Sequence, residues 1–132
     1  MKLETEKTVV LPIWILVGKN RYSLNLNQYN GWYYLLRNKV KKQFKEQVKD
    51  SLGFSFFGEV EIYYRYYAPD KRIRDLMNVI AVADKFFQDT LTEYNCIEDD
   101  NTKIVKKVTS KYMGIDKQNP RIEATIKPYN AI

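Results

Sequence analysis

The chain has 132 residues, 45% of them hydrophobic and 29% charged, as is usual for one globular domain. The single cysteine, Cys96, and the absence of histidine exclude an internal disulfide, a cysteine-based zinc cluster and histidine-dependent catalysis. A formal charge of +6 and a pI of about 9.3 favour a polyanionic partner. The N-terminal residues lack the apolar stretch of a signal peptide, and no apolar run reaches the length of a membrane span. We therefore expect one intracellular domain over residues 1–132, with no membrane partner.

The first half of the chain predicts one strand and one helix. Residues 8–17 form a near-continuous apolar run rich in β-branched residues, which predicts a buried strand. Pro12 within this run indicates an edge position or a bulge. Residues 20–27 are polar and typical of a turn. From Tyr33 to Leu52 apolar residues recur every four positions among lysines, which predicts an amphipathic helix with a basic outer face.

The second half predicts three strands and a second helix. Residues 59–67 alternate between apolar and polar side chains, as in a half-buried strand. Helical spacing returns over residues 75–93, and residues 103–113 and 121–127 alternate again. The order β-α-β-α-β-β predicts a compact α+β domain in which a small mixed β-sheet is covered by two helices.

Acidic residues flank the second predicted helix on both sides. Asp75 stands at its beginning, after the basic run of residues 71–74, and Glu98, Asp99 and Asp100 follow its end. A helix of about 18 residues is roughly 27 Å long. The two clusters therefore share a metal ion only if the loop after the helix folds back or the helix starts well after Asp75. The alternative is that Asp75 is an N-cap and that residues 99–101 form a polar turn.

Four segments together carry a resemblance to a known family. They are Asn20-Arg21-Tyr22, residues 68–78 (APDKRIRDLMN), residues 85–91 (KFFQDTL) and residues 97–100 (IEDD). In this order they resemble the signature of the RusA-like Holliday-junction resolvases, in which Pro-Asp and basic residues precede Arg-Asp-Leu-Asp-Asn, a helical Lys, Phe-Asp-Ala-Leu and Asp-Asp. The resemblance covers most of the chain. It implies a homodimer that binds four-way DNA junctions and makes paired symmetric nicks with Mg²⁺ or Mn²⁺, in the cytoplasm of a bacterial host or its phage.

Carried over by position, the resemblance assigns individual roles. Asp75 and Asp100 match the catalytic aspartates, and Asp99 is a neighbour that shares the metal. Asn78 matches the asparagine of the motif and is assigned to DNA binding. Lys85 matches the catalytic lysine after an insertion of four residues, about one helical turn.

Two positions leave alternatives open. Met77 stands where the family has its second aspartate, and a methionine does not bind magnesium. Asp84 lies near the face of Met77 by helical phase, about 10 Å further along, and either supplies the missing carboxylate or is a surface residue. Lys85 is either a surface residue or part of a polar stripe with Asp75, Asn78 and Asp89. Which of Asp84, Asp99 and Asp100 completes the metal site stays open.

The implied chemistry is hydrolysis of a phosphodiester by water. Magnesium prefers about six oxygen ligands, and Asp75 with Asp99 or Asp100 would hold it so that it acidifies a bound water. Lys85 would offset the charge that develops in the transition state. DNA phosphates would bind to further basic residues, namely Lys71, Arg72, Arg74, Lys103, Lys106, Lys107 and Lys111.

Two competing functions follow from the same residues. The first is a catalytically silent DNA-binding protein of the same fold, which Met77 favours because loss of one carboxylate can abolish metal binding. The second is a small interaction module without a nucleic-acid role, whose charge serves only solubility. The second leaves the ordered basic and acidic motifs unexplained.

Overall fold

The computed structural model describes residues 5–130 of the chain, which form one α+β domain. Its elements are β1 (Lys7–Leu11), β2 (Trp14–Val17), β3 (Asn20–Ser23), α1 (Leu26–Tyr29), α2 (Tyr34–Val48), a 3₁₀ turn (Lys49–Ser51), β4 (Val60–Ala68), α3 (Leu76–Glu93), β5 (Val105–Ile115) and β6 (Arg121–Pro128). The expected α+β class and mixed sheet are confirmed. Among the described residues, no helix is both long and apolar enough to cross a membrane.

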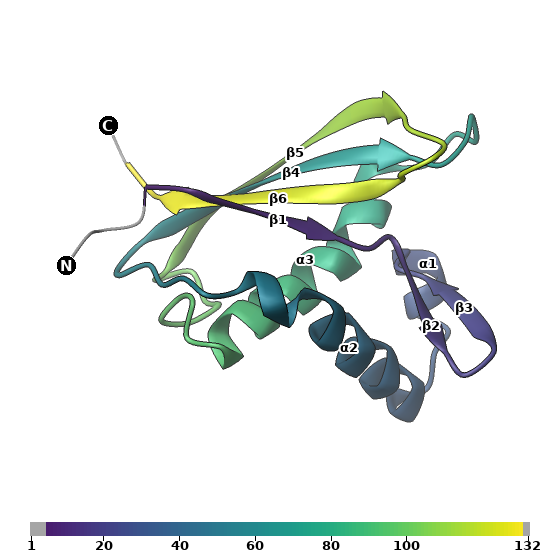
Figure 1. Ribbon diagram of the computed structural model, residues 1–132, viewed down its shortest axis with the longest axis horizontal. Coiled ribbons are helices and arrows are strands. Elements are labelled where there is room, and N and C mark those ends of the chain that lie inside the picture. Colours follow the sequence, from purple (N-terminus) through teal and green to yellow (C-terminus); the bar gives the residue numbers. More distant parts are fainter. Residues whose placement is uncertain (1–4, 131–132) are drawn as a thin grey trace.

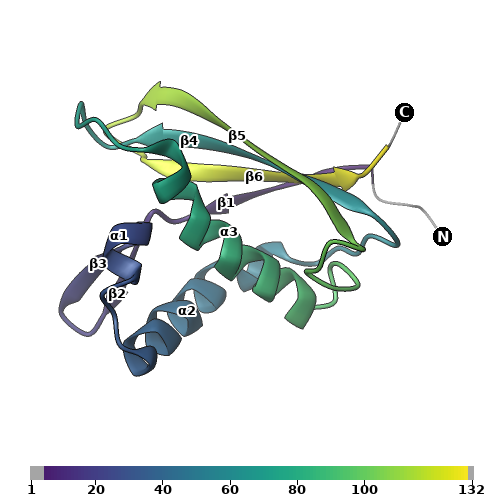
Figure 2. The same ribbon diagram turned by 180° about the vertical axis from the view of Figure 1, so that it is seen from behind.

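A four-stranded mixed sheet forms one layer of the domain. Its order is β1-β6-β4-β5, with β4 and β5 parallel and the other two pairs antiparallel. The parallel pair requires a crossover, and α3 supplies it. The helices lie on one side of this sheet, and its other side is uncovered (Figures 1 and 2).

The region around Pro12 differs from the expectation of one strand over residues 8–17. The run divides into the edge strand β1 and the separate strand β2, because Pro12 has no N–H to continue the ladder. The expected turn over residues 20–27 is also wrong, since it contains β3, which pairs with β2 as a hairpin, and the start of α1. The short helix α1 is a third helix beyond the two expected.

The core lies between the sheet and the two long helices. Val60, Ile62, Tyr64 and Tyr66 of β4 are all buried, so the predicted alternation of this strand is confirmed. Phe44 of α2 and Phe86 of α3 meet edge to face with ring centroids 5.7 Å apart. Burial of such large apolar side chains supplies most of the favourable free energy of folding.

The edge strand β5 is much more exposed than β4. Val108 and Tyr112 lie opposite Ile62 and Tyr66 in the register, and so point to the side of the sheet that carries the helices. Nevertheless they are 41% and 52% exposed. The helices therefore leave part of this side of β5 open to solvent.

Candidate functional site

Asp75 is the N-cap of α3. Its side chain accepts a hydrogen bond of 3.1 Å from the backbone N–H of Met77, and its backbone is extended, with φ −74° and ψ 119°. This bond satisfies one of the free N–H groups in the first turn of the helix. The proposed N-cap role of Asp75 is therefore confirmed by geometry, whereas its role as a metal ligand stays a prediction.

The basic segment before Asp75 is held in a tight turn. Asp70 accepts hydrogen bonds from the backbone N–H of Arg72 (2.9 Å) and from the guanidinium of Arg74, with which it forms an ion pair of 2.8 Å. The bond from Arg74 is the main reason that the pKa of Asp70 lies below its usual value. Lys71 and Arg72 are exposed, and their side chains form no ion pair within residues 5–130. These two cations are free to meet a phosphate.

A pocket of about 290 Å³ lies between this basic segment and the sheet. Its lining comes from the end of β4, the basic turn, the first residue of α3 and β5, and comprises Tyr66, Ala68, Lys71, Arg72, Ile73, Arg74, Leu76 and Tyr112. The sequence motifs had singled out only the three cations. The tyrosine rings join them because β5 runs parallel to β4 with Tyr112 opposite Tyr66.

The acidic residues beyond the other end of α3 pack against its last turns. Asp99 accepts hydrogen bonds from the backbone N–H of Asp100 (2.8 Å) and from the amide of Asn101 (3.0 Å). The carboxyl of Asp100 shares a hydrogen bond with Asp89, and this contact, followed by burial and Asp99, raises the pKa of Asp100. The loop therefore forms a polar turn, as the alternative interpretation expected, and also brings two carboxyl groups together.

Asp89 connects this acidic turn to two cations. It forms an ion pair with Lys41 of α2, and Lys85, one turn earlier on α3, adds a positive charge. Burial alone would raise the pKa of Asp89, but the hydrogen bonds from Lys41 and Asp100 and the two positive charges lower it overall. The charge of Lys85 therefore acts on the acidic end of the helix.

Asp84 belongs to neither group. It accepts hydrogen bonds from the buried Tyr64 hydroxyl and from the Gln88 amide (2.9 Å). Burial, and then the charge of Asp84, raises the pKa of Tyr64 well above its usual value. Asp84 thus satisfies a polar group of the core, and its metal-binding role stays a prediction.

The distance along α3 separates the predicted metal ligands. Asp89, the contact of Asp100, follows Asp75 by fourteen positions, which corresponds to about 21 Å of helix. Within the part of the chain that the structure describes, no group of three or more His, Cys, Asp or Glu side chains is placed to hold a metal ion. Asp75, Asp84 and the pair Asp99 and Asp100 thus stand at different points along α3 in one chain, and their joint role as magnesium ligands stays a prediction.

The remaining predicted DNA-binding residues are spread along the molecule. Asn78 is half-buried in the first turns of α3. Lys103 precedes β5, and Lys106 forms an ion pair of 3.3 Å with Glu59. Lys107 and Lys111 are exposed and lie opposite Glu61 and Arg65 of β4. None of these residues lines the pocket beside the basic segment.

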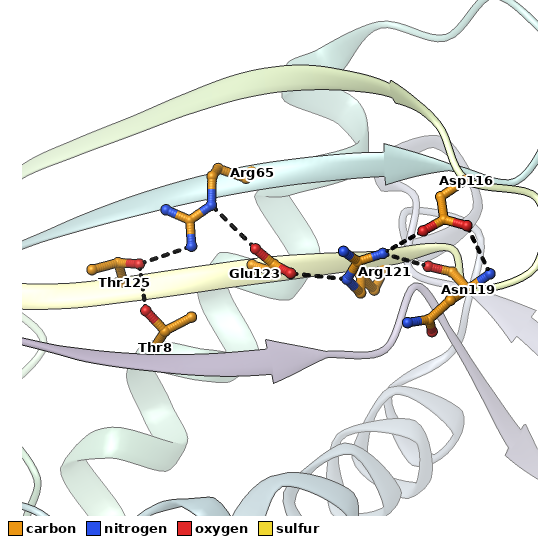
Figure 3. A network of polar contacts seen from close by, with 7 residues as sticks. All are labelled: Thr8, Arg65, Asp116, Asn119, Arg121, Glu123 and Thr125. Carbon is orange, nitrogen blue, oxygen red and sulfur yellow. Dashed lines mark hydrogen bonds and ion pairs between the residues drawn. The ribbon is translucent and has the colours of Figure 1, made fainter.

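The uncovered side of the sheet carries a polar network that the sequence motifs did not indicate (Figure 3). Arg65 binds Glu123 (3.3 Å) and Thr125 (3.1 Å), and Arg121 binds Glu123 (3.0 Å) and Asp116 (2.8 Å). The guanidinium of Arg121 also lies 3.8 Å from the centre of the Tyr67 ring. Both arginines are thus engaged within the sheet, and the network serves to hold its strands together.

No protein-family model matches the chain, and no curated protein matches it. The likeness to the RusA-like resolvases therefore depends on the motifs alone.

Proposed function

We propose that this protein is a metal-dependent endonuclease that resolves four-way DNA junctions as a homodimer. The observation that carries the proposal is the carboxyl pair of Asp89 and Asp100, with Asp99 hydrogen-bonded beside it and Lys85 one turn away. Two carboxylates in contact repel each other unless a proton or a cation lies between them. Carboxylate oxygens are also the ligands that magnesium prefers.

A single chain does not complete this metal site. Asp75 lies at the opposite end of α3 from Asp100, so an ion held by both would require a second copy of the chain. A homodimer, which the resemblance implies, would satisfy this requirement. No catalytic step through the ion follows from the residues of one chain.

The basic segment supports the DNA-binding part of the proposal. Lys71 and Arg72 are exposed cations without an internal partner in the described chain, and Asp70 fixes the turn that carries them. Contacts of this kind bind phosphates without reading sequence, and the affinity falls as salt rises.

A catalytically silent DNA-binding protein is the second candidate. It is favoured because Asp75 is engaged as an N-cap and Met77 occupies the position of a family carboxylate. This candidate predicts the same salt-sensitive binding but no cleavage.

The test is cleavage of a labelled four-way junction, with linear duplex as comparison, with and without magnesium. Asp75→Asn is the informative variant, because asparagine retains an N-cap acceptor but loses the charge that a metal requires. Asp50→Asn, in the 3₁₀ turn and outside the four motif segments, is the matched control. We expect paired symmetric nicks from the wild type and the control, and none from Asp75→Asn.

The other outcomes separate the candidates. Salt-sensitive junction binding without any magnesium-dependent cutting would favour the silent DNA-binding protein. Absence of junction binding would contradict both.

A further inference from the structure

The pocket beside the basic segment combines two features that a phosphate site alone does not need. One wall is aromatic, with the rings of Tyr66 and Tyr112 6.0 Å apart and tilted by 45°. The rim carries Lys71, Arg72 and Arg74. No acidic residue lines the pocket, and since Arg74 is paired with Asp70, the unpaired positive charge comes from Lys71 and Arg72.

Two large side chains at this pocket are left open to solvent. Ile73 is 97% exposed and Tyr112 is 52% exposed, although both line a hollow of about 290 Å³. This volume is close to the lower limit of about 300 Å³ for pockets that hold small organic ligands. Large apolar groups around a hollow indicate a binding surface when they lie together in this way.

The chemistry of the lining selects the ligand. A ring of Tyr112 that is half exposed offers a face on which a planar base can stack. The cations at the rim suit the phosphates on either side of such a base. Base-paired DNA buries its base faces within the stack, so only an unpaired nucleotide presents both groups at once.

We propose that this pocket binds one unpaired nucleotide of DNA, with the base against Tyr112 and the flanking phosphates at Lys71 and Arg72. The inference rests on the proposed function, because it specifies the part of a branched DNA that the basic segment contacts. It adds a preference for a base outside the helix, which phosphate contacts alone do not give.

The experiment uses a fluorescent duplex that carries a single unpaired 2-aminopurine, and a second duplex with an abasic residue at the same place. Stacking of one base corresponds to an affinity ratio of about 5- to 150-fold. We expect the wild type to bind the duplex with the base more tightly by a ratio in this range, and to quench the 2-aminopurine fluorescence. Tyr112→Ala should remove the difference and the quenching, whereas Tyr112→Phe should retain both.

Two controls make the result specific. Tyr34→Ala removes a tyrosine that is 71% exposed on α2 and should retain the full preference. Binding of all variants to a fully paired four-way junction is measured in parallel. Equal affinity for the duplex with the unpaired base and the duplex with the abasic residue, together with junction binding, would contradict the nucleotide-binding role of the pocket and leave the proposed function intact. Absence of binding to every DNA would overturn both.

Discussion

The two ends of α3 differ in chemistry although one rigid helix joins them. At the first end, Asp75 caps the helix and the adjacent turn presents free cations beside an aromatic pocket. At the second end, Asp89, Asp99 and Asp100 gather near Lys41 and Lys85. The comparison teaches that residues which form one motif in the sequence need not form one site in a chain. The first end carries exposed cations beside aromatic rings, and the second carries carboxyl groups beside two lysines.

The largest expected effect comes from truncating a core side chain of the helix that joins the two ends. Phe86 is 1% exposed and packs edge to face on Phe44 and Tyr29. Phe86→Ala should lower the free energy of unfolding by about 3–5 kcal/mol, because it leaves a cavity in the core. Phe57→Ala, at a 66% exposed position, is the control and should change it by less than about 0.5 kcal/mol. Urea denaturation measures the free energy of unfolding of both variants. Similar losses in the two would contradict the packing of Phe86 in the core.

Removal of the two free cations, Lys71 and Arg72, should change the DNA binding that we assign to the first end of α3. Lys71→Ala combined with Arg72→Ala should weaken junction binding and make the plot of log affinity against log salt shallower by about two. Lys39→Ala with Lys42→Ala, two exposed lysines on α2, is the matched control of equal charge. Fluorescence anisotropy at several salt concentrations measures the slopes. An unchanged slope in the first variant would show that DNA binds elsewhere.

Two substitutions at Asp75 separate capping from metal binding. Asp75→Ala should destabilise the fold by about 1 kcal/mol, since the N–H of Met77 loses its acceptor. The stability of Asp75→Asn should stay close to that of the wild type, because the side-chain acceptor for the N–H of Met77 remains. Thermal unfolding gives the comparison. A large loss in Asp75→Asn would mean that its charge, and not its hydrogen bond, stabilises the helix.

The smallest expected effect is a pH dependence of the protein's stability that arises from Asp100, at the second end of α3. The pKa of Asp100 is raised in the folded state, chiefly by the hydrogen bond shared with Asp89. Its protonated form is thus favoured by folding, and this contribution is lost as the pH rises through the raised pKa. The Tm of Asp100→Asn should therefore rise relative to the Tm of the wild type as the pH is increased from 3.5 to 7.

Magnesium should act on the same position. At pH 7 added magnesium should raise the Tm of the wild type but not that of Asp100→Asn, because a ligand that binds only the folded state stabilises it. Equal responses would contradict a cation site at this end.

Long regular patterns made the central elements predictable. The nine residues of β4 alternate without interruption, and α3 repeats its apolar spacing over 18 residues, so the predicted bounds differ by no more than one residue at either end. The hairpin of β2 and β3 was missed because each strand has four residues and residues 20–23 are mostly polar. Short strands carry too few alternations to be distinguished from turns.

The site was predictable where a contact is local. The N-cap bond of Asp75 spans two residues, and the sequence motif already placed it at a helix start. The pairing of Asp89 with Asp100, and of Tyr66 with Tyr112, depends on how a loop folds back and on the register of β4 and β5. Side-chain patterns within each segment do not specify such contacts between segments.

The position of β6 has a consequence for synthesis of the protein. β6 lies between β1 and β4 in the sheet, yet it follows both in the chain, and Lys7 lies opposite Ile126. While the ribosome is still extending the chain, β1 has no neighbour in this sheet and β4 has one free edge. Such edges are templates for pairing with other chains. The nascent protein is therefore most exposed to misassembly until residues 121–128 emerge and join the two halves of the sheet.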